Sequence, residues 1–121
     1  MSSYRDLEIY QKAFDLAIRV HKATLKLPKL ELFEQGSQLR KSSKSVKDTI
    51  VEGYGRKRYK AEFIRFLTFA HASCDEATDQ VLTITKLYPD RDDFKPLLIE
   101  YEQLGKQIYS FIEYVENNWN K

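Results

Sequence analysis

The chain has 121 residues, of which 42% are hydrophobic and 31% charged, with only four glycines and three prolines. This composition excludes a disordered or low-complexity protein and predicts a single domain over residues 1–121, long enough for one core but not for two. No long apolar run occurs, and the segment Met1–Asp6 lacks the apolar core of a secretion signal, so we expect a cytoplasmic protein.

Apolar residues at helical spacing predict two helices in the first half of the chain. The first runs from Leu7 to Leu25 and is stopped by Pro28. Its expected seam is Leu7, Tyr10, Phe14, Ala17, His21 and Thr24, with Ala13, Leu16 and Val20 beside it. The second follows the break at residues 28–31 and has the seam Leu32, Gly36, Leu39, Ser43, Val46, Ile50 and Gly53. Arg40, Lys44 and Lys47 fall on another face of that second helix.

The same spacing predicts two further helices. The third runs from about Lys60 to Tyr88, and the fourth begins after a cap at Asp92 or Asp93, with Pro96 in its first turn. Their seams are Phe63, Leu67, Ala70, Cys74, Ala77, Val81 and Ile84, and then Phe94, Leu97, Tyr101, Leu104, Ile108, Phe111 and Val115. Because no segment alternates with period two, the predicted fold is all-α, an antiparallel up-down-up-down four-helix bundle.

Apolar residues outside these seams predict contact with another subunit. Phe66, Phe69, Tyr109, Tyr114 and Trp119 exceed what one central core needs, so we expect part of the surface to self-associate.

The arrangement of reactive side chains predicts no enzyme, no cofactor and no metal site. Neither His21 nor His71 has a glutamate three positions before it, as the metal-binding bundles require. Ser73 and Cys74 follow His71, but adjacent helical residues point about 100° apart, which does not assemble a nucleophile and its base. Cys74 is the single cysteine and lies on an apolar seam, so we expect a buried structural thiol.

The remaining chemistry is a local excess of positive charge. The segment from Arg40 to Arg65 holds nine lysines and arginines against three acidic residues, whereas the rest of the chain is net acidic. Candidate contacts to nucleic-acid phosphates are Arg40, Lys41, Lys44 and Lys47, followed by Arg56, Lys57, Arg58 and Lys60. Tyr54 and Tyr59 could stack on unpaired bases.

Two other interpretations fit the same residues. Gly53 and Gly55 could simply end a helix, with Tyr54 packed on the bundle and the cations solvated or placed against helix carboxyl-terminal dipoles. Alternatively, the basic surface could hold an acidic protein, which would make the chain a protein–protein interaction adaptor with no nucleic-acid role.

Four motifs in order along the chain resemble one known family. They are Gln38-Leu39-Arg40 with Ser45-Val46, then Glu52-Gly53-Tyr54-Gly55-Arg56, Glu62-Phe63-Ile64-Arg65-Phe66-Leu67, and Ala70 with Ser73 and Glu76. Together they are similar to the 23S ribosomal RNA intervening-sequence proteins. The resemblance implies a four-helix bundle that assembles as a homopentamer, with Glu52, Gly53 and Gly55 as a structural motif.

A related bundle is the accessory variability protein of diversity-generating retroelements, which works with a reverse transcriptase and nucleic acid through basic surfaces. That relation implies nucleic-acid contacts at Arg40, Lys44, Lys47, Arg56, Lys57 and Arg58, and a reverse transcriptase or another protein as a partner. The prediction is therefore a non-enzymatic oligomeric bundle that binds RNA or DNA as a scaffold or accessory factor.

Overall fold

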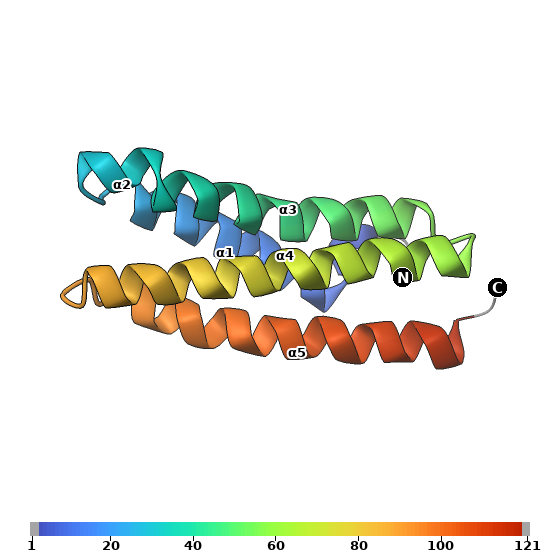
Figure 1. The fold of residues 1–121 in the computed structure, drawn as a ribbon. Helices are drawn as coiled ribbons and strands as arrows, with labels where there is room; N and C mark the ends of the chain where they lie inside the picture. The colour runs from blue at the N-terminus through green and yellow to red at the C-terminus, as the bar shows by residue number, and fades with distance from the viewer. Residues whose placement is uncertain (1–2, 120–121) are drawn as a thin grey trace.

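Four long helices lie side by side in the computed structural model, which describes residues 3–119 (Figure 1). The elements are η1 (Tyr4–Asp6), α1 (Glu8–Thr24), α2 (Lys29–Phe33), α3 (Gln35–Gly55), α4 (Lys60–Leu87) and α5 (Phe94–Asn118). Successive long helices run in opposite directions, and residues 3–119 contain no strand. This arrangement confirms the predicted antiparallel four-helix bundle.

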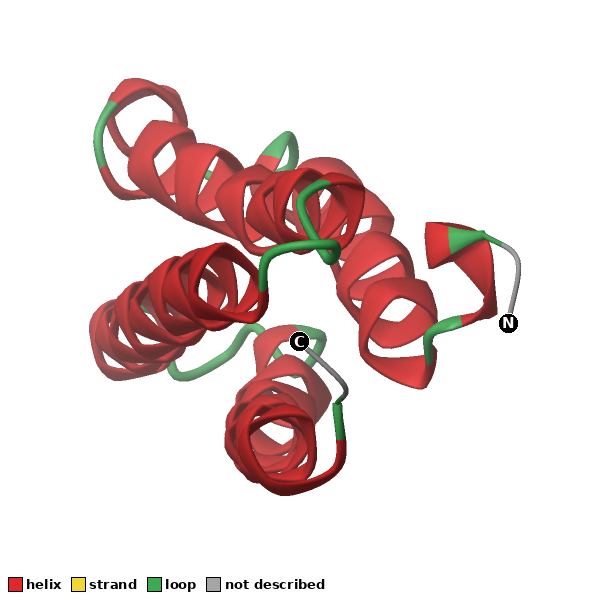
Figure 2. Cartoon of the chain, turned by 90° about the vertical axis from the view of Figure 1, so that its right-hand side faces the viewer, coloured by secondary structure: helices red, strands yellow, loops and turns green. Residues whose placement is uncertain are grey.

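The long helices form a closed ring around the core. Figure 2 views the four long helices roughly along the bundle. The closest packing is between α3 and α4; α4 also contacts α5, and α1 contacts both α3 and α5. The loosest of these four seams is that between α1 and α5. Residues fully buried in the core include Leu16, Val20, Leu39, Ile50, Phe63, Leu67, Ile84, Phe94, Tyr101, Leu104 and Ile108.

The predicted seam of α1 is partly wrong. Its buried face is Ile9, Ala13, Leu16, Ala17, Val20, Ala23 and Thr24. Phe14 is exposed, and Tyr10 and His21 are half-buried. The face is rotated because α1 packs against both α3 and α5, so its buried residues point between two neighbours. Tyr10 instead packs edge-on against Tyr4 of η1, with ring centres 4.9 Å apart, and lies 5.9 Å from the ring of Phe14.

The predicted second helix is divided at Glu34, whose backbone is not helical (φ −107°, ψ −98°). Glu31 explains the break. Its buried carboxylate accepts hydrogen bonds from the Tyr88 hydroxyl (3.3 Å) and, at 3.4 Å, from the backbone N–H of Gln35. A Cβ atom at position 36 would lie only 2.7 Å from the backbone carbonyl oxygen of Glu31, so the tight corner between α2 and α3 needs glycine at position 36.

The remaining helix boundaries agree with the sequence to within a residue or two, including Pro96 in the first turn of α5. Asp93 does precede α5 at the N-cap position, but its side chain makes no capping bond. Its carboxylate instead accepts hydrogen bonds from the Arg91 guanidinium at 3.1 and 2.8 Å.

The seam between α3 and α4 is polar as well as apolar. The Ser42 hydroxyl donates to Oε1 of Gln80 at 2.7 Å, and the hydroxyls of Ser45 and Ser73 are 2.8 Å apart. These small side chains allow the two helix backbones to approach closely, which positions the turn that joins them.

Candidate nucleic-acid interface

The turn between α3 and α4 lies at the end of the bundle that also carries the end of α5, on the right of Figure 1. Gly53 allows α3 and α4 to approach closely at this turn, because a Cβ atom at position 53 would be 3.0 Å from Cβ of Phe66 and 3.4 Å from Cδ1 of Phe63. Gly55 has open space around it. Tyr54 is buried edge-on against Phe63, with ring centres 6.2 Å apart. The prediction that its ring stacks on bases is therefore wrong.

The end of α5 holds this turn in place. The indole N–H of Trp119 donates to the carbonyl oxygen of Lys57 at 3.1 Å, and the Trp119 ring lies 5.1 Å from the ring of Phe63. The ammonium of Lys60 donates to the carbonyl oxygen of Glu116 at 2.5 Å. Lys60 is therefore engaged with the backbone of α5, and the turn is part of the packed bundle.

Two arginines at the turn share one carboxylate. Oε1 of Glu62 is 3.5 Å from Nη1 of Arg56 and 3.6 Å from Nη1 of Arg65. Each guanidinium also lies over the ring of Phe66, at 4.6 Å for Arg56 and 5.4 Å for Arg65. Arg65 extends this stack to Phe69, whose ring centre is 5.1 Å from its guanidinium. One negative charge against two positive ones leaves a net positive surface.

The rest of the turn adds positive charge that no carboxylate neutralises. Arg58 is exposed and makes no hydrogen bond or ion pair within residues 3–119. The ammonium of Lys57 lies 4.4 Å from the centre of the Tyr54 ring. Tyr59 precedes α4 without a side-chain cap, so the amino-terminal end of the α4 dipole, which is positive, adds to the same surface. Such an end favours anions.

The lysines of α3 form a separate group. Nζ of Lys44 is 3.4 Å from Nδ1 of His21 on α1, and Lys47, three positions later on α3, pairs with Asp48 at 2.8 Å. Lys41 is exposed beside the groove between α3 and α4 and has no ionic partner in the described part of the chain. Lys47 is nine residues before Arg56, roughly 14 Å along the helix axis. The predicted candidates are therefore divided into two patches.

Arg40 belongs to neither patch, because its guanidinium connects three helices at the far end of the bundle. It donates to Oγ1 of Thr24 at 3.0 Å and to the carbonyl oxygen of Leu32 at 2.8 Å. Arg91 acts similarly nearby, donating to the carbonyl oxygens of Ala23 (3.1 Å) and Lys26 (3.2 Å) at the end of α1. Arg91 donates to carbonyl oxygens at the negative end of the α1 dipole, and Arg40 places a second positive charge beside that end.

Sequence reasoning missed one residue of the surface, Arg65, and could have found it. Arg65 follows Glu62 by three positions and precedes Phe69 by four, a spacing that places all three on one side of a helix. Glu52, which the resemblance places in a structural motif, is exposed, and its side chain forms no hydrogen bond or ion pair among residues 3–119. Within that motif, Gly53 has a structural role, because the absence of a side chain there allows α4 to pack closely against α3.

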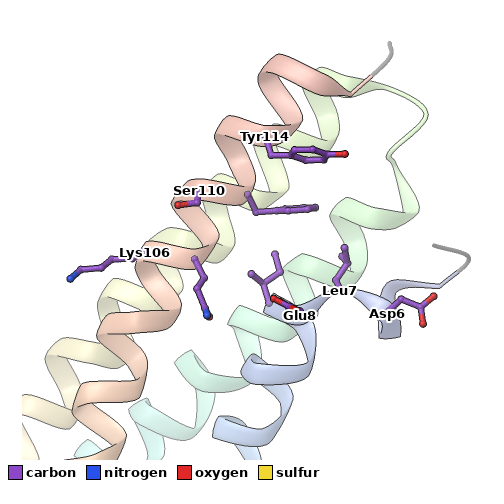
Figure 3. Close-up of a pocket in the computed structure, with 9 residues that line it drawn as sticks. Asp6, Leu7, Glu8, Lys106, Ser110 and Tyr114 are labelled. Carbon is purple, nitrogen blue, oxygen red and sulfur yellow. The ribbon is translucent and has the colours of Figure 1, made fainter.

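The seam between α1 and α5 contains a groove of different character (Figure 3). It has a volume of about 640 Å³, and its lining combines apolar and charged side chains. These are Asp6, Leu7, Glu8, Ile9, Lys106, Gln107, Ser110, Phe111 and Tyr114. Two acidic residues against one lysine make this groove a poor match for a polyanion.

Farther along the same seam, Glu100 bridges α5 to α1. Its carboxylate accepts from Nζ of Lys12 and Nη2 of Arg19, each at 2.7 Å. Hydrogen bonds from Arg19 and then Lys12 lower the pKa of Glu100 to about 2. The bridge joins the two helices across the loosest of the four seams.

The thiol of Cys74 and the phenol of Tyr101 are both shielded in the interior. Cys74 is fully buried, as predicted, and its Sγ–H donates to the carbonyl oxygen of Tyr101 at 3.4 Å. Burial raises the pKa of Cys74 to about 12, and burial also raises the pKa of Tyr101. Among residues 3–119 no three His, Cys, Asp or Glu side chains come together as a metal site.

Comparisons with known proteins agree with this architecture. A solved structure of a protein of unknown function from the S23 ribosomal protein family of Bacteroides thetaiotaomicron has a TM-score of 0.75 and 18% sequence identity. The alignment covers 87% of this chain and 98% of that one, and at this identity it shows the shared fold alone. No curated protein matches. None of the described helices is long and apolar enough to span a membrane. A model of the 23S rRNA-intervening sequence proteins matches residues 5–110, so the chain belongs to that family.

Proposed function

We propose that this protein is a non-enzymatic, cytoplasmic homo-oligomer that binds RNA or DNA through the turn between α3 and α4, as a scaffold or accessory factor. One observation supports this most directly. Arg58 has no partner within residues 3–119, while the two neighbouring guanidiniums of Arg56 and Arg65 share the single carboxylate of Glu62. The turn thus holds more positive charge than the fold itself uses.

Binding at such a surface depends on phosphates rather than on base sequence. Cations that neutralise phosphates release counterions, so affinity falls steeply as salt concentration rises. Base recognition needs hydrogen-bond groups arranged against base edges, whereas the turn offers cations and aromatic rings. We therefore expect strong dependence on salt and weak dependence on sequence.

Assembly of several copies would strengthen this binding. We propose a homopentamer, in which exposed apolar residues of the long helices meet a neighbouring subunit; Leu82, Ile99 and Tyr109 are exposed. Repeating the basic turn around a ring multiplies weak contacts to one polyanion. Light scattering on a sizing column should give a mass near five times 14.3 kDa. A monomeric mass would refute the assembly and remove the multivalency.

The binding test compares two double variants with the same loss of charge. Lys57→Gln/Arg58→Gln removes charge at the turn, and Lys22→Gln/Lys26→Gln removes it near the far end of α1. Arg56 is left intact because it packs on Phe66. Fluorescence anisotropy with labelled RNA and DNA should show weaker binding only for the turn variant, with a log–log salt slope shallower by about 1 to 2. Equal affinities of the two variants would contradict the proposed site.

A second candidate function, a protein-interaction adaptor, is favoured by one surface of α1. Phe14, Ile18 and Leu25 are all exposed, and their spacing places them on one face of the helix, on the side of Lys44 of α3. An apolar strip beside lysines suits a partner with apolar and acidic residues. In this case a partner should remain bound after nuclease treatment of a cell extract, and Phe14→Ser/Ile18→Ser should release it. Loss of the partner on nuclease treatment would instead favour nucleic acid.

A further inference from the structure

Aromatic rings accompany the cations along one face of α4. Tyr59 precedes the helix, Phe66 follows seven positions later and Phe69 three after that, a spacing that keeps the three on neighbouring lines of the helix surface. Phe66 is half-buried beneath two guanidiniums, whereas Tyr59 and Phe69 are 64% and 42% exposed. The exposed rings of Tyr59 and Phe69 have no role in the core of the bundle, and the arginines over Phe66 and Phe69 share a single carboxylate.

Part of this face, namely Phe66, Phe69 and the two arginines over them, is ordered before any ligand arrives. The rings of Phe66 and Phe69 meet edge-to-face at 5.4 Å, and the guanidinium of Arg65 lies over both. Arg56 covers Phe66 from the adjoining turn. Side chains held by such contacts lose little conformational freedom when they bind, which favours affinity.

We propose that this face, composed of Arg58, Tyr59, Arg65 and Phe69, binds single-stranded nucleic acid in preference to duplex. The inference rests on the proposed function and adds to it the structural state of the polymer. The arginines contact phosphates, while the rings of Tyr59 and Phe69 stack on unpaired bases.

The geometry explains the preference. Phe69 lies ten positions after Tyr59, which corresponds to roughly 15 Å along a helix, so the two rings are far enough apart to meet bases of different nucleotides. In a duplex both faces of each base are covered by neighbours, and the rings have nothing to stack on. A duplex can use only the cations, whereas a single strand can use the cations and the rings together.

The experiment measures anisotropy of the full chain with a labelled single strand, with its duplex, and with a strand of equal length that lacks bases. We expect the single strand to bind more tightly than either of the others. Phe69→Ala and Tyr59→Ala should each weaken single-strand binding by about fivefold or more and leave duplex binding unchanged. Phe69→Leu, which keeps an apolar side chain but removes the ring, should behave like Phe69→Ala.

Two matched controls separate stacking from general loss of apolar surface. Phe14 on α1 is 45% exposed, close to the 42% of Phe69, and Tyr114 on α5 is half exposed, at 50% against 64% for Tyr59. Phe14→Ala and Tyr114→Ala should leave both affinities as they are. Circular dichroism of every variant checks that the helices persist.

The outcomes distinguish the inference from the function on which it rests. Equal affinity of the wild-type protein for single strand, duplex and base-free strand, with no effect at Tyr59 or Phe69, would overturn the inference and leave the basic turn as a phosphate site. Failure of the wild-type protein to bind any of the three at low salt would overturn the proposed function, and the inference with it.

Discussion

Replacing Gly53 by alanine should destabilise the bundle, whereas the same replacement at Gly55 should not. A Cβ atom at Gly53 would lie 3.0 Å from Cβ of Phe66. That atom is fixed to the α4 backbone and cannot rotate away, so the helices themselves must separate. A Cβ atom at Gly55 would meet nothing within 4 Å. Both positions lie in the last turn of α3, which makes Gly55 a matched control.

The expected magnitude follows from two opposing effects. Alanine is favoured over glycine within a helix by up to about 1 kcal/mol, and this gain applies to both variants. Overpacking a closely packed contact typically costs about 1–3 kcal/mol, and this cost applies only at Gly53. Gly55→Ala should therefore be neutral or slightly stabilising. The free energy of unfolding of Gly53→Ala should be lower than that of Gly55→Ala by about 1–3 kcal/mol.

Urea unfolding at one fixed protein concentration measures this difference. Trp119 is the single tryptophan, and its ring lies against Phe63 beside the turn, so its fluorescence reports the relevant packing. The fixed concentration is needed because self-association adds to apparent stability. Equal midpoints and slopes for the two variants would refute the reasoning, since they would show that α4 does not approach α3 closely at Gly53.

Three other predictions concern the interior and the far end of the bundle. Because the pKa of Glu100 is lowered to about 2 from 4.5, its contribution to stability is present above pH 4.5 and lost as the pH falls toward 2. The free energy of unfolding of Glu100→Gln should be lower than that of the wild type by about 1 kcal/mol at pH 7 and should decrease less on acidification. Acid titration of the helical signal of both proteins measures this difference. Cys74 should remain unlabelled by a thiol reagent at pH 8 in the folded protein and react promptly in urea, so fast native labelling would contradict its burial. Arg40→Gln should lower the free energy of unfolding by about 1–3 kcal/mol with no change in nucleic-acid affinity, whereas Lys41→Gln should leave stability unchanged; thermal unfolding and anisotropy of both variants test this contrast.

The long helices were predictable because their signals are local. Apolar residues recur with helical spacing, and prolines at 28 and 89 mark two of the connections. The division between α2 and α3 was not predictable, because no breaking residue stands at Glu34. It arises from the Glu31 carboxylate and Tyr88, which are 57 residues apart in the chain. Only the folded bundle brings these groups together.

The candidate site shows the same distinction. The concentration of charge around Arg58 was evident from sequence, and within the described residues 3–119 the Arg58 side chain has no partner. The sequence could not separate Arg40 from the surface lysines of α3, because its partners Thr24 and Leu32 belong to other helices. Nor could it show that Tyr54 is buried while Tyr59 is exposed, since both lie in the same basic stretch. Residue type shows which contacts a side chain can make, but its packing in the folded bundle decides whether it is free to make them with a ligand.

The serine-rich seam between α3 and α4 has a consequence for how the chain selects one alignment of its helices. An entirely apolar seam between helices of 21 and 28 residues could slide by one turn and bury nearly the same area. Such a slide here would separate Ser42 from Gln80 and Ser45 from Ser73, leaving part-buried hydroxyls without these partners. These hydrogen bonds therefore favour one register, and in this register Gly53 lies opposite Phe66 and Arg56 lies over the Phe66 ring.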